Sequence, residues 1–166
     1  IRDIEREVGY GGATRLSLSV TESGLVELSC ATPLLCAHFN KDEAAELFAL
    51  LDVADPGLVL AHQLLGFPAS VIAGLRDWLG TRHSLYWAHD FYALCPRVTM
   101  IDAIGRFCGG ADATTCGRCV EMGGAHETSV LNELSPAEHR ALFDSLLAKF
   151  THVIAPVSYT HLRAHE

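Results

Sequence analysis

The alternation of short apolar runs with a helical apolar stripe between residues 57 and 88 constrains the fold more than any other feature. The run "GLVLAH" (57–62) has the length and composition of a buried strand, and "SLYWA" (84–88) is the next such run. Between them an apolar stripe at helical spacing follows Pro68 and stops at Gly80. It comprises Val71, Ile72, Leu75, Trp78 and Leu79. Because short strand–helix–strand connections are typical of parallel strands, we predict an α/β fold, with a Rossmann-like parallel sheet and helices on both faces.

Further elements flank this unit. Period-two alternation in residues 14–20 and 25–30, around "TESG", predicts a hairpin at an edge. Helical spacing predicts one helix over 41–53, ended by "DPG", and another from Ser135, where "SPAE" supplies a capping Ser, an early Pro and a Glu. The second helix leads into a short strand, "HVIAP" (152–156). We therefore predict one α/β domain over residues 1–156, with a cysteine-rich insert at about residues 95–122.

The two ends of the chain differ from the rest. Residues 157–166, "VSYTHLRAHE", have neither helical nor strand periodicity. Read back as codons they resemble a translated sequencing adapter, so we expect a non-native tail and leave His161 and His165 out of every site. Because Ile1 is not an initiator methionine, we also expect the amino terminus to be truncated.

The charge balance narrows the classes of partner. A net charge of −8 and a pI of about 5.5 argue against a nucleic-acid groove or an anionic-membrane patch, since both need clustered Lys and Arg. The longest apolar stretches are interrupted well short of the roughly 20 residues that a membrane helix needs. We expect no nucleic-acid partner, no transmembrane segment and, without a signal peptide, a cytoplasmic location.

Two histidines fall at the ends of consecutive predicted strands. His62 closes the run 57–62, and His89 directly follows the run 84–88. In open parallel sheets, ligands bind beyond the carboxyl ends of the strands. We therefore expect both side chains to point into a common crevice.

Four of the six cysteines follow His89 closely. Cys95, Cys108, Cys116 and Cys119 are spaced C-x12-C-x7-C-x2-C, and Cys30 and Cys36 stand apart from them. A C-x2-C pair in a tight turn is typical of metal sites, and four thiolates suit a closed, structural Zn²⁺ site. Two alternatives stay open: disulfides, which a reducing compartment disfavours, and a redox pair, which lacks its usual strand-to-helix turn.

The ordered segments carry a resemblance to a known family. "LVLAHQLLGFP", "LYWAHDFYALCPRVTMIDAIGRFCGG", "CGRCVE" and "HVIAP" resemble the amino-terminal half of a bacterial, retaining-type glycosyltransferase of the GT-B class. The resemblance covers roughly residues 58–156. It implies two Rossmann-like domains facing each other across a cleft, the first binding the acceptor and the second the nucleotide-sugar donor. The chain would then be inactive alone, because the donor-binding, carboxy-terminal domain is missing.

The resemblance also implies roles for individual residues. His89 would lie near the transferred sugar as a catalytic residue, and Asp90 would orient His89 or the loop that follows it. His62 and Arg97 would bind the substrate, with Arg97 facing an acceptor phosphate or a carboxylate of the neighbouring domain. The acceptor would be a glycan or a lipid-linked glycan in polysaccharide biosynthesis. The enzyme would then be cytoplasmic, either free in the cytoplasm or attached peripherally to the inner membrane.

Two other classes of function compete with this interpretation. The first is a non-enzymatic, zinc-stabilised α/β interaction domain. The second is a nucleotide-binding redox domain, which requires a reactive thiol at Cys116 or Cys119.

Overall fold

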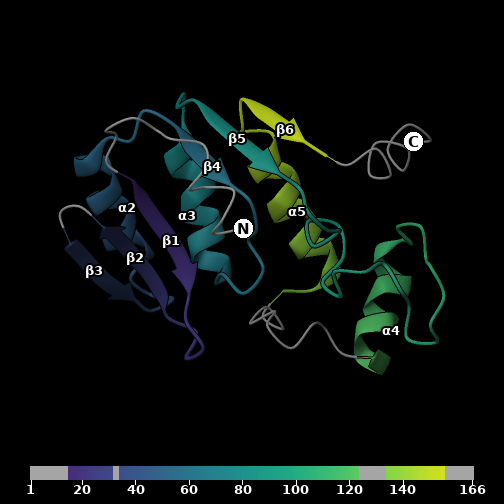
Figure 1. Ribbon diagram of the computed structural model, residues 1–166. Helices are drawn as coiled ribbons and strands as arrows, with labels where there is room; N and C mark the ends of the chain where they lie inside the picture. Colours follow the sequence, from purple (N-terminus) through teal and green to yellow (C-terminus); the bar gives the residue numbers. More distant parts are fainter. Residues whose placement is uncertain (1–14, 32–33, 124–133, 156–166) are drawn as a thin grey trace.

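Two three-stranded sheets organise the described part of the chain, shown as a computed structural model in Figure 1. The structure describes residues 15–31, 34–123 and 134–155. The first sheet is antiparallel, in the order β1 (Leu16–Val20), β2 (Val26–Ala31), β3 (Leu34–Phe39). The second is parallel, in the order β4 (Val59–Ala61), β5 (Ser84–Trp87), β6 (His152–Ile154). The chain is therefore a mixed α/β protein, as predicted.

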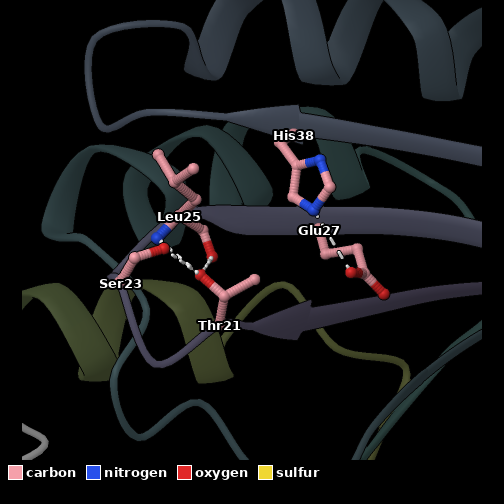
Figure 2. Close-up of polar contacts among 5 residues, drawn as sticks. All are labelled: Thr21, Ser23, Leu25, Glu27 and His38. Carbon is pink, nitrogen blue, oxygen red and sulfur yellow. Dashed lines mark hydrogen bonds and ion pairs between the residues drawn. The ribbon is translucent and has the colours of Figure 1, made fainter.

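The predicted amino-terminal hairpin is confirmed, but it belongs to a separate antiparallel sheet and not to an edge of the parallel sheet. β1 and β2 pair antiparallel from Leu16↔Cys30 to Val20↔Val26. The Thr21 hydroxyl accepts a hydrogen bond from the Leu25 amide at 3.1 Å, which closes the turn between the strands (Figure 2). The third strand, β3, is not among the predicted elements, because its sequence "LLCAHF" has no clean alternation of apolar and polar residues.

Three amphipathic helices form where the sequence predicts them. They are α2 (Ala44–Ala54), α3 (Ala69–Leu79) and α5 (Pro136–Leu147). Ser135 and Glu138 form the predicted capping box at the start of α5. The predicted stripes supply most of the core, in which α2 packs on α3 and α3 on α5. The buried residues of these stripes are Leu47, Phe48, Leu51, Val71, Ile72, Leu75, Trp78, Leu79, Phe143, Leu146 and Phe150.

The parallel sheet is buried on one face. Ser84 and Tyr86 of β5 are buried, and Tyr86 packs against Phe150 beyond α5. The alternate positions point to the other face, where Leu60, Trp87 and Ile154 are 42%, 44% and 40% exposed. Within the described ranges, helices therefore cover one face of this sheet, and the predicted second helical layer is not present.

The cysteine-rich segment contains a helix where we expected a loop. Helix α4 (Ala113–Gly123) carries both cysteines of the C-x2-C pair, so this pair does not lie in a tight turn. The Asp112 carboxylate accepts hydrogen bonds from the amides of Thr114 and Thr115 at 2.9 and 3.0 Å and so caps the helix. Only Cys116 of α4 is buried, and α4 has few large apolar residues, so the sequence did not predict it as a core helix.

Two predictions concern the ends of the chain and the membrane. The proposed tail, 157–166, and the first fourteen residues lie outside the described residues. None of the helices in the described part of the chain is long and apolar enough to cross a membrane.

Candidate functional site

His62 and His89 lie together at the carboxyl ends of β4 and β5. The two strands pair in parallel with Ala61 beside Tyr86, so the residues that follow them leave the sheet at the same edge. His62 Nδ1 is 3.3 Å from His89 Nε2, and the ring centroids are 5.6 Å apart. The sequence predicted both positions, because the ends of neighbouring parallel strands meet.

Trp87 extends the pair of histidines into a triangle of three rings. Its ring centroid is 5.8 Å from that of His89, with an interplanar angle of 2°, and 6.0 Å from that of His62. Trp87 and His89 are exposed, and His62 is half-buried. These three residues form an exposed surface, the imidazole–tryptophan platform, that offers flat rings and hydrogen-bonding nitrogens together.

Asp90 holds the loop that follows β5. One of its carboxylate oxygens accepts a hydrogen bond from the Gln63 amide, and the other accepts the Tyr92 backbone N–H at 2.7 Å. Gln63 follows His62 and Asp90 follows His89, so this bond ties together the two segments that carry the histidines. Asp90 thus contacts the loop through Tyr92, and its expected role at the site stays a prediction.

Two residues of this site, Trp87 and Gln63, were not predicted from the sequence. Trp87 lies two residues before His89, and period-two alternation along a strand could have placed both on one face. Gln63 directly follows His62, as Asp90 directly follows His89, but a glutamine side chain belongs to none of the motifs used in the sequence analysis. The hydrogen bond between the two side chains in the structure identifies Gln63 as a partner of Asp90.

Arg97 lies in the cysteine-rich segment. Its Nε donates a hydrogen bond to the Ile101 carbonyl at 3.2 Å. Its guanidinium also lies against Gly123 of α4, where a Cβ would be 2.9 Å from Cζ of Arg97. The described contacts thus join Arg97 to α4, while those of His62 and His89 are with Trp87 and with each other.

The four cysteines of the segment are neighbours. The thiol of Cys95 interacts electrostatically with those of Cys108 and Cys119, and that of Cys116 with those of Cys95 and Cys108. All four are free thiols. Burial raises the pKa of Cys95 and of Cys116, and the positive Arg140 partly offsets this rise at Cys116.

Arg140 of α5 fastens this segment to the core. Its guanidinium donates hydrogen bonds to the carbonyls of Leu94 and Ala111 at 2.9 and 2.8 Å and to the sulfur of Cys116 at 2.8 Å. A cationic donor on a sulfur favours the thiolate form, which is the form that binds metals. The donor set therefore suits a thiophilic cation such as Zn²⁺.

The spacing of the four thiols is wider than in a closed zinc site. In a tetrahedral site with zinc–sulfur distances of about 2.3 Å, sulfur atoms lie about 3.8 Å apart. Among the described residues, no three of these sulfurs lie within 4.8 Å of one another; the group of three ligand atoms that meets this limit is Glu27, Cys36 and His38 in the antiparallel sheet. Binding one ion by all four thiols would require the segment to contract.

Comparison with known proteins does not assign the chain to a family. No family model, no curated protein and no solved structure matches it.

Proposed function

We propose that this chain is the acceptor-binding part of a GT-B type glycosyltransferase. The enzyme would move a sugar from a nucleotide-activated donor to a glycan or lipid-linked acceptor in cytoplasmic polysaccharide biosynthesis. The support is the resemblance of residues 58–156, together with a parallel sheet whose carboxyl edge carries the motif histidine, His89. In this proposal a second, carboxy-terminal domain binds the nucleotide sugar.

The observation that carries the proposal is the imidazole–tryptophan platform. A sugar ring has an apolar face of C–H groups and a rim of hydroxyls. The exposed ring of Trp87 offers a surface for the apolar face, and the flanking imidazoles offer donors and acceptors for the hydroxyls. The platform lies at the edge of the sheet where parallel α/β folds bind ligands.

The proposed roles follow from these contacts. Because His62 Nδ1 faces His89 Nε2 at 3.3 Å, one ring donates and the other accepts, which couples the tautomers of the two rings. On binding, an acceptor hydroxyl would replace His62 as the partner of His89. His89 would accept the hydroxyl proton as the hydroxyl oxygen bonds to the donor sugar, and the nucleotide would leave with the electron pair of the broken sugar–phosphate bond. Asp90 and Gln63 would keep the two segments in place. Arg97 would meet an acceptor phosphate at a rim formed by the cysteine-rich segment.

The tryptophans allow a direct test of acceptor binding. The chain has two, of which Trp78 is buried and Trp87 is exposed. Titration with mono- and oligosaccharides of hexoses and hexosamines should change the fluorescence of Trp87, and Trp87→Phe should abolish the change. His89→Ala should weaken binding about three- to tenfold, the range expected for the loss of one hydrogen bond.

A matched control separates the platform from the strand that bears it. His83 is exposed and lies at the opposite, amino end of β5, so His83→Gln should bind saccharides as the unchanged chain does. Equal binding by His89→Ala, or a fluorescence response that persists in Trp87→Phe, would contradict the proposal.

A second candidate function is a zinc-stabilised interaction domain without catalysis. It is favoured by the exposed apolar face that Leu60, Trp87 and Ile154 form on the parallel sheet, since such faces commonly mark contact surfaces. The same titration discriminates the two, because an interaction domain of this kind would give no saccharide response.

A further inference from the structure

The outward face of the antiparallel sheet brings together three different metal-binding groups. Glu27 of β2 is paired directly with His38 of β3, and Ser29 is paired with Cys36. Because strand residues two apart share a face, Glu27, Cys36 and His38 all lie on one side of the β2–β3 ladder. The opposite side carries Val26, Leu28 and Cys30, which are buried in the core.

The side chains of these three residues converge. Their carboxylate, thiol and imidazole ligand atoms all lie within 4.8 Å of one another. Figure 2 shows the imidazole of His38 facing the carboxylate of Glu27, with Nε2 at 3.3 Å from Oε2. Two ligands of a tetrahedral zinc ion, each about 2.0–2.1 Å from the metal, are about 3.3–3.4 Å apart. The Glu27–His38 pair already has that spacing.

Cys36 completes the group. Its thiol is exposed, and the sulfur lies within 4.8 Å of the ligand atoms of both Glu27 and His38. The ladder from Val26↔Phe39 to Ala31↔Leu34 fixes the three backbone positions. Three ligands held by one pair of strands form a site that needs little ordering on binding.

We propose that Glu27, Cys36 and His38 bind one Zn²⁺ ion, through one carboxylate oxygen, the sulfur and Nε2, with water as the fourth ligand. The mixture of oxygen, sulfur and nitrogen ligands suits zinc, whereas Ca²⁺ and Mg²⁺ prefer oxygen ligands alone. On binding, the S–H bond of Cys36 breaks, its proton passes to solvent, and the sulfur bonds to the metal. Such a three-ligand site is distinct from the four-cysteine segment.

The test uses the full chain with Cys108→Ser and Cys119→Ser, which removes two of the four other clustered thiols. In this background we expect one Zn²⁺ per chain. Glu27→Gln, Cys36→Ser and His38→Gln should each weaken zinc affinity by at least about 100-fold. Loss of a residue that only orients a metal ligand already weakens affinity by up to about 100-fold, and these three residues are ligands themselves. With Co²⁺ as the probe, the thiolate-to-cobalt absorption should be present and should disappear in Cys36→Ser.

Matched controls lie at exposed positions away from the proposed site. Glu22→Gln, in the exposed turn between β1 and β2, and His152→Gln, on exposed β6, remove the same groups elsewhere and should leave zinc affinity unchanged. Circular dichroism verifies that each variant folds. As a second measurement, Cys36→Ser in the otherwise unchanged chain should lose one zinc equivalent. Zinc affinity that is equal in Cys36→Ser and its parent, or no zinc in the background chain, would overturn the proposal.

Discussion

His139 is an ionisable side chain whose surroundings in the folded protein favour its neutral form. It is 1% exposed, its Nε2 donates to the Tyr92 carbonyl at 2.6 Å, and its Nδ1 is buried without a partner among the described residues. Burial lowers the pKa of His139, Arg140 lowers it further, and the bond to Tyr92 opposes both. A second proton would therefore be placed on a nitrogen that has no acceptor.

The lowered pKa of His139 predicts how stability depends on pH. The unfolded chain takes up this proton near pH 6.5, whereas the folded chain does so only at lower pH. Between the two pKa values the unfolded state holds more protons, so stability falls as pH falls through 6.5. Urea unfolding at pH 7.5 and 5.5 should show a loss of up to about 1.4 kcal/mol from this group.

Substitution isolates this contribution. His139→Gln keeps a donor for the Tyr92 carbonyl and should be less stable at pH 7.5, but with a smaller loss between pH 7.5 and 5.5. His83→Gln, an exposed histidine, should keep the full loss. An equal loss in His139→Gln and the unchanged chain would show that His139 does not set the pH dependence.

At the scale of elements, α2 and α3 meet where Gly74 lies against Phe48. A Cβ on Gly74 would lie 2.7 Å from Cδ2 of the Phe48 ring. Overpacking of this kind costs about 1–3 kcal/mol, and alanine regains about 1 kcal/mol of helix propensity. Gly74→Ala should therefore lower the free energy of unfolding by about 1 kcal/mol, measured by thermal or urea unfolding.

Gly117 in α4 is the natural control for Gly74. It is also helical, but a Cβ there would meet no atom within 4 Å. Gly117→Ala should leave stability unchanged or raise it by up to about 1 kcal/mol, because only helix propensity changes. If both alanine variants behave alike, the contact with Phe48 does not govern the spacing of α2 and α3.

The elements that could be predicted from the sequence are those with a strong apolar period. The stripe of α3 puts five residues on its buried side, and both its start at Pro68 and its end at Gly80 have local chemical causes. β3 has no clean alternation, and α4 has few large apolar residues. β3 is an edge strand with Leu34 exposed, and α4 is held through Cys116 and Arg140, contacts between segments that no local pattern contains.

The candidate sites divide in the same way. The meeting of His62 and His89 could be predicted, because parallel strands end at a common edge. The group of Glu27, Cys36 and His38 could not, because it depends on the register of β2 against β3, which the sequence leaves open. Cys36 and His38 are two residues apart, as neighbours on one face of a strand are. This spacing indicates a shared face only within a strand, and β3 was not predicted.

At the scale of the whole molecule, one apolar core joins both sheets. Phe48 of α2 packs against Trp78 of α3, with ring centroids 5.8 Å apart, and Asp52 accepts hydrogen bonds from Trp78 and Arg82, both at 2.7 Å. The segment around the four clustered cysteines contributes little to this core, since its buried residues are few. Arg140 is its main polar attachment to α5.

The cysteine-rich segment should therefore unfold separately from the core. If Cys95, Cys108, Cys116 and Cys119 share one Zn²⁺, chelation should speed hydrogen exchange across residues 95–119 and leave α3 protected, because the buried core cluster that contains the stripe of α3 includes no buried residue of the segment. Cys116→Ser should lose this zinc and increase proteolysis between residues 96 and 123.

Substitution of Arg140 separates the effect of zinc on the cysteine-rich segment from the effect of the hydrogen bonds that attach the segment to α5. Arg140→Ala removes the donors to Leu94, Ala111 and Cys116 and should expose the segment to protease even when zinc is supplied, whereas Arg140→Lys should restore part of the protection. His38→Gln, which alters only the antiparallel sheet, should leave exchange in residues 95–119 unchanged. Because α3 and α5 bury their stripes against each other, the core should stay folded in all these variants. Loss of protection in α3 together with residues 95–119 would instead mean that the segment and the core form one cooperative unit.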